Sequence, residues 1–203
     1  MKQIAGIILA AGGSSRYGQP KQLLPWGDTT VLNATIQTTW LTRLKPVIVV
    51  LGAFETQITA TIPDTGVRVV SNPDWQTGQS SSLKAGIRAL PDNCDGALFL
   101  LADQPQLNVH LLDALLSEAE NGAVALAPLI DGRRANPVYF SRETFHLLMS
   151  ISGDQGGRAV MREVNVKYVE WYDEMQFHDI DEPEDYEILH RYYFGEAVRS
   201  DKV

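Results

Sequence analysis

The fold is decided by residues Ile4–Lys21, which read IAGIILAAGGSSRYGQPK. The first six are apolar and suit a strand that is buried on both faces of a sheet. A loop rich in glycine, serine and basic residues follows at once, so it begins at the carboxyl end of that strand. Open α/β sheets bind their ligands at this place. We therefore expect a ligand site in the loop after Leu9.

Apolar runs of strand length alternate with stretches of helical periodicity along the rest of the chain. The expected strands are Ile4–Leu9, Val47–Leu51, Val67–Val70, Ala97–Leu101, Val124–Ala127, Val138–Phe140 and Val166–Trp171. The expected helices are Val31–Leu41, Glu55–Ile62, Ser81–Leu90, Val109–Ala119, Glu143–Met149, Arg158–Val164 and Glu184–Tyr193. This alternation predicts an α/β fold, with a mostly parallel mixed sheet between two layers of helices. Two strands near residues 127–140 have no helix between them, which predicts an antiparallel excursion.

Length and composition favour a single domain. The chain has 203 residues, of which 44% are apolar, and it shows no repeat or linker. We expect one domain over residues 1–194 and a disordered tail over residues 195–203, where apolar periodicity is absent.

Charge and cysteine content restrict the partners. The net charge is −8, which argues against a nucleic-acid surface because phosphate backbones need a concentrated cationic face. The single cysteine, Cys94, cannot form an internal disulfide, and the four histidines are too scattered for a zinc cluster. No apolar run approaches the ~20 residues of a membrane span. We therefore expect a cytoplasmic protein without a nucleic-acid or membrane partner.

The loop after the first strand carries the groups of an anion site. These are Gly12, Gly13, Gly18, Ser14, Ser15, Arg16 and Lys21. The glycines are expected to reach positive φ and let successive N–H groups point at phosphate oxygens, while the serines add hydroxyl donors and the basic residues add charge. It is not a P-loop, since Gln19 stands where that motif requires lysine, and its glycines do not fit G-x-G-x-x-G. A plain glycine-rich surface turn is the alternative.

The loop resembles a known family. L-A-A-G-x-S-x-R-x-G-x-x-K is typical of molybdenum cofactor guanylyl- and cytidylyltransferases and related nucleotidyltransferases, and it is matched by Leu9, Ala10, Ala11, Gly12, Ser14, Arg16, Gly18 and Lys21. The resemblance covers residues 3–194 and implies a Rossmann-like fold, as in nucleotide-diphospho-sugar transferases, in which this loop wraps the triphosphate of an NTP. It also implies that Lys21 and Arg16 stabilise charge at the α-phosphate and the pyrophosphate leaving group.

A carboxylate ends the apolar run Gly96–Leu101. Burying Asp103 unpaired would cost several kcal/mol, so it needs a partner, and Mg²⁺ binds one or two carboxylates together with phosphate oxygens. Capping of the following turn is the alternative. The resemblance favours the metal, because a strand ending in D-x-P carries the metal aspartate in this family.

A second acidic pair lies in FHDIDEPEDY, residues 177–186. Asp179 and Asp181 stand two apart, so in an extended segment both point to one face and toward one cation. Asp181 also precedes a helix, with Pro183 early in it and Glu184 three residues on, which is the spacing of a capping box. We expect Asp179 to bind Mg²⁺ and leave Asp181 open between ligand and cap.

Two further segments match the family. Gly78, Ser80 and Ser82 start a helix where the resemblance places the base and sugar, although helix capping explains serines equally well. At residues 131–140, Ala135 and Asn136 replace the family's Gly-His on the acceptor side. The turn SGDQGGR ends in Arg158, which together with Arg133 or Arg134 would receive an anionic acceptor, unless these residues form a solvated basic face.

Together these features predict a Mg²⁺-dependent nucleotidyltransferase whose substrates are an NTP and a phosphate-bearing small molecule. The resemblance implies transfer of CMP from CTP, or of GMP from GTP, to molybdopterin, with the recipient molybdoenzyme or its chaperone as a partner. Ala11 favours CTP, because a second glycine is usual in the guanylyl branch. Cytidylyl or uridylyl transfer to a sugar, alditol or phosphoamine phosphate is one alternative, and a non-catalytic nucleotide-binding maturation or regulatory subunit is another.

Overall fold

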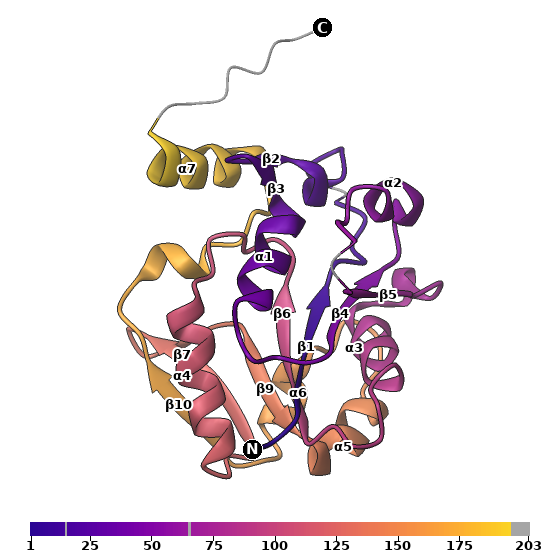
Figure 1. Ribbon diagram of the computed structural model, residues 1–203, viewed down its shortest axis with the longest axis vertical. Coiled ribbons are helices and arrows are strands. Elements are labelled where there is room, and N and C mark those ends of the chain that lie inside the picture. The colour runs from indigo at the N-terminus through magenta and orange to yellow at the C-terminus, as the bar shows by residue number, and fades with distance from the viewer. Residues whose placement is uncertain (15, 65, 196–203) are drawn as a thin grey trace, which may run out of the picture.

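The computed structural model describes residues 1–14, 16–64 and 66–195. Its main sheet has eight strands in the order β10-β7-β9-β6-β1-β4-β5, with β8 paired to β7. These strands are β1 (Ile4–Leu9), β4 (Val47–Leu51), β5 (Arg68–Ser71), β6 (Gly96–Leu101), β7 (Ala125–Ile130), β8 (Arg133–Arg134), β9 (Val138–Ser141) and β10 (Val166–Glu170). The α/β fold with a mostly parallel mixed sheet is thereby confirmed (Figure 1).

The antiparallel excursion is where the sequence predicts it. β9 runs antiparallel to both β6 and β7, and β8 is antiparallel to β7. Every other pairing in this sheet is parallel among the described residues. The excursion puts the turn between β7 and β9 beside the end of β6, where Asp103 lies.

Helices cover both faces of the sheet (Figure 1). They are α1 (Val31–Trp40), α2 (Glu55–Thr59), α3 (Gln79–Arg88), α4 (Val109–Glu120), α5 (Phe145–Ser150), α6 (Gly157–Met161) and α7 (Pro183–Phe194). Buried side chains of α1, α2 and α4 share one core cluster, and those of α3, α5 and α6 share another. Helix α2 ends three residues before the predicted end and α6 begins and ends earlier than predicted.

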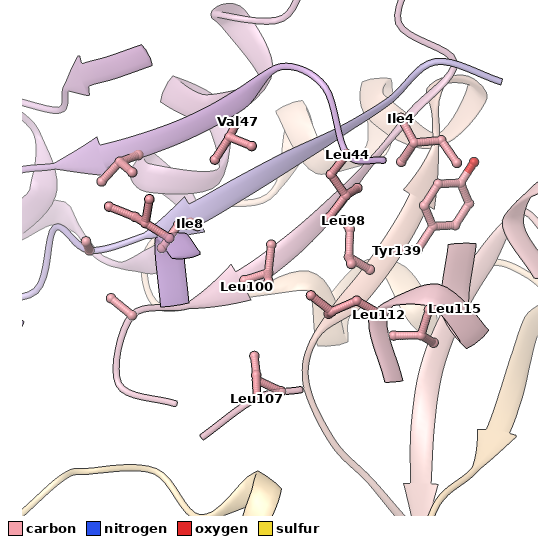
Figure 2. Packing of buried hydrophobic residues seen from close by; sticks show 14 of the residues in the cluster. Ile4, Ile8, Leu44, Val47, Leu98, Leu100, Leu107, Leu112, Leu115 and Tyr139 are labelled. Atoms are coloured by element: carbon pink, nitrogen blue, oxygen red, sulfur yellow. The ribbon is translucent and has the colours of Figure 1, made fainter. Parts of the chain in front are cut away.

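Alternation along β1 explains how one strand serves both clusters. Ile4 and Ile8 pack with the α4 side of the sheet, whereas Ala5 and Ile7 pack with the α3 side. Figure 2 shows the first of these cores, where Leu112 and Leu115 of α4 lie over the sheet. Since the strand is buried on both faces, its carboxyl end is held rigidly at the start of the loop.

A smaller cluster fixes the C-terminal helix to the loop region. Trp26 lies in the hairpin of β2 (Pro25–Trp26) and β3 (Thr29–Thr30), and it packs with Ile180 and with Leu189 of α7. The hydroxyl of Tyr186 donates to the carbonyl of Pro25 at 2.7 Å. This contact brings the segment before α7 beside the phosphate loop (Figure 1).

None of the helices in the described ranges is long and apolar enough to cross a membrane. Of the predicted disordered tail, only Gly195 is described, and it ends α7 at a φ of 88°. Residues 196–203 lie outside the described residues, so that prediction and the single-domain boundary stay predictions.

Candidate active site

The loop after β1 is anchored at the carboxyl edge of the sheet. The N–H of Ala10 donates to the carbonyl of Val50 in β4, and the N–H of Ala102 donates to the carbonyl of Leu9. Ala10 and Ala11 are buried, whereas Gly12 is exposed. The loop therefore leaves the sheet between β4 and the end of β6, as expected for a ligand loop.

Its local conformation differs from the prediction at two glycines. Positive φ occurs at Ser14, at 50°, and at Gly18, at 78°, but not at Gly12 or Gly13. A Cβ on Gly13 would lie 3.0 Å from the ring of Trp75, so Gly13 serves close packing. Ser15 lies outside the described residues, and its predicted role in nucleotide binding stays a prediction.

Lys21 lies at the centre of the acidic groups. Its Nζ donates to Asp103 Oδ2 at 2.6 Å, to the carbonyl of Ile180 at 2.8 Å and to Asp181 Oδ1 at 3.4 Å. The short helix Lys21–Leu23 presents the lysine, and both Lys21 and Asp103 are mostly shielded from solvent. The sequence separations of 82 and 160 residues show that the fold creates this contact.

Asp179 lies next to this pair. Its Oδ1 accepts a 2.7 Å hydrogen bond from Gln104 Nε2, and the N–H of the following residue, Ile180, donates to the carbonyl of Asp103 at 3.1 Å. Burial, and then the negative charge of Asp103, raise the pKa of Asp179 to about 6, although the Gln104 hydrogen bond and Lys21 oppose the shift. Two carboxylates thus lie close enough to influence each other, and Lys21 contacts one of them.

These residues fit a divalent metal as two ligands. Asp103 Oδ1 is buried and accepts no hydrogen bond, which leaves it for a cation. Asp179 supplies a second carboxylate, and Mg²⁺ commonly takes one or two carboxylates with substrate phosphates. Over the described residues, however, no three His, Cys, Asp or Glu side chains are grouped to hold a metal by themselves. A metal here would rely on Asp103, Asp179 and the nucleotide.

Of the two roles left open for Asp181, the structure excludes the helix cap, and the role of metal ligand stays a prediction. The N-cap of α7 is Glu182, and Asp185 completes the capping box by accepting from the N–H of Glu182 at 2.8 Å. Asp181 instead pairs with Arg16, at 3.0 Å, and with Lys21. Pro183 takes the first helical position, one residue before the predicted start at Glu184, so the N-cap is Glu182 and the Asp181 carboxylate is free to contact the loop.

Gln22 is a site residue that the sequence alone did not reveal. Its side chain is 2% exposed, and Nε2 donates to the carbonyls of Ala10 and Gly12 at 3.0 and 3.1 Å. Its Oε1 accepts from Ser14 Oγ at 3.4 Å, and that hydroxyl in turn accepts from the N–H of Lys21. The side-chain amide of Gln22 thus connects the start of the loop, at Ala10 and Gly12, to Ser14, and so holds the loop in one conformation.

Replacing Gln22 with leucine is expected to loosen the loop. The carbonyls of Ala10 and Gly12 lose their donor; leaving the buried Ala10 carbonyl unpaired costs about 1–3 kcal/mol, which lowers the melting temperature. The KM for NTP should rise while kcat at saturation changes less, because Gln22 holds in place the loop that is proposed to bind the triphosphate. Thermal unfolding and steady-state kinetics measure both effects. An unchanged KM in a destabilised variant would contradict the positioning role.

The start of α3 lies against the turn at residues 152–157. The N–H of Ser80 donates to the carbonyl of Gly153 at 3.1 Å, and Ser80 is buried. The Ser82 hydroxyl accepts from Asn72 Nδ2 at 3.0 Å. These contacts connect the predicted nucleotide segment to the predicted acceptor turn, and the roles of Gly78, Ser80 and Ser82 toward nucleotide stay predictions.

Gly78 has a packing role that can be tested. Its φ is 109°, and a Cβ would lie 2.3 Å from the backbone of Gly153. Gly78→Ala should therefore lower the melting temperature by several degrees, since backbone must move. Gly153→Ala is the matched control, because it also has positive φ but its Cβ would meet nothing within 4 Å. Equal losses in the two variants would show that strain alone, and not the close approach, sets the cost.

A cavity of about 990 Å³ adjoins the acidic groups. Gln104 and Asp179 line it, and so do both predicted acceptor residues, Asn136 and Arg158. Phe99 of β6 contributes part of its apolar lining. The cavity is large enough for a small-molecule substrate that reaches the acidic groups.

A family model and several known proteins match this chain. A family model described as a MobA-like NTP transferase domain matches residues 6–169. Purine catabolism protein PucB of Bacillus subtilis is 31% identical, over 93% of this chain and 96% of its own. Nicotine blue oxidoreductase of Paenarthrobacter nicotinovorans is also 31% identical, over 88% and 92%. Molybdenum cofactor cytidylyltransferase of Escherichia coli is 29% identical, over 70% and 72%.

Solved structures with the same fold are similar to this chain over most of its length. Rv0371c from Mycobacterium tuberculosis H37Rv has a TM-score of 0.85 at 29% identity, covering 94% of this chain and 98% of its own. A structure of Rv0371C in complex with manganese has a TM-score of 0.81 at 27% identity, covering 94% and 99%. With a strand, loop, lysine and aspartate arranged as that family's motif implies, the chain belongs to the family of nucleotidyltransferases with a MobA-like NTP transferase domain.

Proposed function

We propose that this nucleotidyltransferase transfers CMP from CTP to the phosphate of molybdopterin and releases pyrophosphate, with Mg²⁺ as cofactor. The observation that carries the proposal is the meeting of Lys21, Asp103 and Asp179 at the loop after β1. Cation and carboxylates there face one edge of the sheet, which suits a metal-bound triphosphate. The product would pass to a recipient molybdoenzyme or its chaperone in the cytoplasm.

The chain's own residues act by positioning and by charge. The loop amides of residues 11–14 bind the triphosphate, and Lys21 and Arg16 neutralise the charge that develops as pyrophosphate departs. Asp103 and Asp179 hold Mg²⁺, which when bound supplies further positive charge to the phosphate oxygens. An acceptor phosphate oxygen forms a bond to the α-phosphorus, while the bond from that phosphorus to the bridging oxygen of pyrophosphate breaks. The reaction needs no protein nucleophile.

The choice of base and acceptor is supported by the relatives and by one residue. The Escherichia coli relative is named a cytidylyltransferase of molybdenum cofactor, and others, from Bacillus species, are named probable guanylyltransferases. Ala11 stands where the guanylyl branch usually has glycine, which favours CTP. Asn136, in place of the usual histidine, lines the cavity and would contact the acceptor.

The test is a screen in two steps. Thermal stabilisation by each of the four NTPs with Mg²⁺ identifies the nucleotide, and CTP is expected to give the largest shift. Release of pyrophosphate with molybdopterin then identifies the acceptor, with sugar, alditol and amino-alcohol phosphates as competitors. Turnover with one of those and none with molybdopterin would overturn the acceptor assignment.

Two other functions compete. The Paenarthrobacter relative is named an oxidoreductase, so hydride transfer is one, although the loop lacks G-x-G-x-x-G. Consumption of NADH or NADPH without pyrophosphate release would support it. A nucleotide-binding maturation subunit without turnover is the other. CTP binding with no pyrophosphate release from any acceptor would support that function instead.

A further inference from the structure

The cavity beside the acidic groups has a strongly cationic wall. Four arginines line it, namely Arg133, Arg134, Arg158 and Arg162. Arg133 and Arg134 form β8, whereas Arg158 and Arg162 lie in α6 and directly after it. Elements that are distant in sequence thus bring positive charge to one cavity in a protein whose net charge is −8.

Three of these arginines lack an internal counter-charge. Within residues 1–14, 16–64 and 66–195, no carboxylate oxygen lies within 4.0 Å of Arg134, Arg158 or Arg162. The half-buried Arg134 donates instead to the neutral sulfur of Met161, at 3.2 Å. Burial, and then the charge of Arg158, lower the pKa of Arg134, with a further contribution from Arg162.

Arg133 does not belong to this cluster. The hydrogen bond and the negative charge of Asp131 raise the pKa of Glu174, the positive charge of Arg133 opposes that shift, and both carboxylates line the cavity. Arg133 therefore has acidic neighbours on its own side. The remaining three, Arg134, Arg158 and Arg162, form what we call the arginine cluster; they make no ion pair within the described residues, although the carboxylate of Asp154 lines the same cavity.

The arginine cluster is distinct from the groups around Lys21. Asp103 and Asp179 come from the segments after β6 and before α7, and neither carboxylate makes an ion pair with the cluster. The phosphate that attacks the nucleotide must lie beside Lys21 and these carboxylates, because the α-phosphorus is there in the proposed reaction. Gln104 and Asp179 line the same cavity as the cluster, so one ligand would reach both.

We propose that the arginine cluster binds a second anionic group of the acceptor, separate from the phosphate that is joined to the nucleotide. The inference deepens the proposed function and rests on its phosphate-bearing acceptor. It defines the acceptor as a small molecule with negative charge at two places, a phosphate at the Lys21 end and another anion at the arginine end. Three guanidinium groups suit such an anion, because each offers a planar pair of donors.

The cluster is first tested with sulfate alone, which requires no knowledge of the acceptor. Sodium sulfate should raise the melting temperature of the unaltered protein more than sodium chloride of equal ionic strength. In a variant with Arg134, Arg158 and Arg162 all changed to glutamine, the sulfate effect should shrink while stabilisation by CTP and Mg²⁺ remains. The variant should be at least as stable as its parent without sulfate, because repulsion is relieved. A lower melting temperature and an unchanged sulfate effect would overturn the proposal.

The second test separates the two anions of the acceptor. Affinity for molybdopterin and for its dephosphorylated form is measured by titration, for the parent and for Arg134→Gln. If the cluster holds a second anion, Arg134→Gln lowers the affinity for both ligands by a similar factor, about tenfold or more. The loss from removing the arginine and the loss from removing the phosphate are then independent. A loss confined to the phosphorylated ligand would mean that the cluster holds the attacking phosphate and would overturn the inference.

The control for both tests is an arginine outside the cavity. Arg88→Gln removes an exposed arginine of α3 that does not line the cavity, and it should change neither sulfate nor ligand binding. If the parent fails to release pyrophosphate with CTP and molybdopterin, the proposed function fails, whatever the sulfate result. If the parent turns over but the cluster variant keeps its KM for acceptor, the further inference alone fails.

Discussion

Lys21→Ala is expected to slow pyrophosphate release by about a thousandfold, while the dissociation constant for CTP changes by less than about tenfold. The amine contacts Asp103, Asp181 and the carbonyl of Ile180, so it lies at the carboxylates beside which the proposed reaction would place the triphosphate. Negative charge on the departing pyrophosphate grows in the transition state, and a lysine at that place stabilises it more there than in the ground state.

Single-turnover kinetics and CTP binding, measured separately, check this prediction. Lys167→Ala is the control, since it removes a lysine on the edge strand β10 that pairs with Glu118 and does not line the cavity. If Lys21→Ala loses affinity for CTP but keeps its rate of turnover, the proposed role at the transition state is contradicted. Unfolding must be followed as well, because the substitution leaves Asp103 and Asp181 without their shared cation.

The strands were predictable because their sequence signal is local. β1 and β4 have the predicted bounds, and β6 and β9 differ by one residue at one end, since continuous apolar runs between polar turns leave little choice. The two-residue strands were missed. β8 consists of two arginines and is a strand only because β7 lies beside it, which no local pattern reveals.

The site was predictable where a motif named the residues and unpredictable where contacts decide. Lys21, Asp103 and Asp179 stand at positions that the motifs indicate, and the fold brings them together although Lys21 and Asp103 alone are 82 residues apart. Gln22 and Gln104 carry no motif of their own. Each is identified by the buried hydrogen bonds it makes, and their only sequence signal is adjacency to a motif residue.

Contacts also decide which residue caps α7. Asp181 and Glu182 are both followed three residues later by an acid, so the spacing alone allows either as N-cap. The pairing of Asp181 with Arg16 and Lys21, and of Tyr186 with the β2 region, decides between them. Tertiary contacts therefore set the helix boundary that local sequence leaves open.

Asp179→Asn is expected to abolish most Mg²⁺-dependent activity and, at the same time, to stabilise the protein without metal. Activity should fall by about a hundredfold or more, because one of two carboxylates for the metal is lost. Stability at pH 7 should rise by about 1–3 kcal/mol, because burial and the Asp103 charge raise the pKa of the Asp179 carboxyl to about 6 and disfavour its ionised form. The amide oxygen of asparagine still accepts from Gln104.

The stability difference between the parent and Asp179→Asn should depend on pH. With chelator present, the parent is destabilised by its ionised Asp179 above pH 6 and recovers stability as the carboxyl gains a proton below it. The advantage of Asp179→Asn in melting temperature should therefore be largest near pH 7 and shrink toward pH 4. Saturating Mg²⁺ should stabilise the parent and leave the variant nearly unchanged. Asp113→Asn, an exposed control on α4, should show neither effect. A variant that is less stable than its parent at pH 7 would mean that Asp179 is a structural carboxylate, and Asp103 and Asp181 would then be left as the candidate ligands beside Lys21.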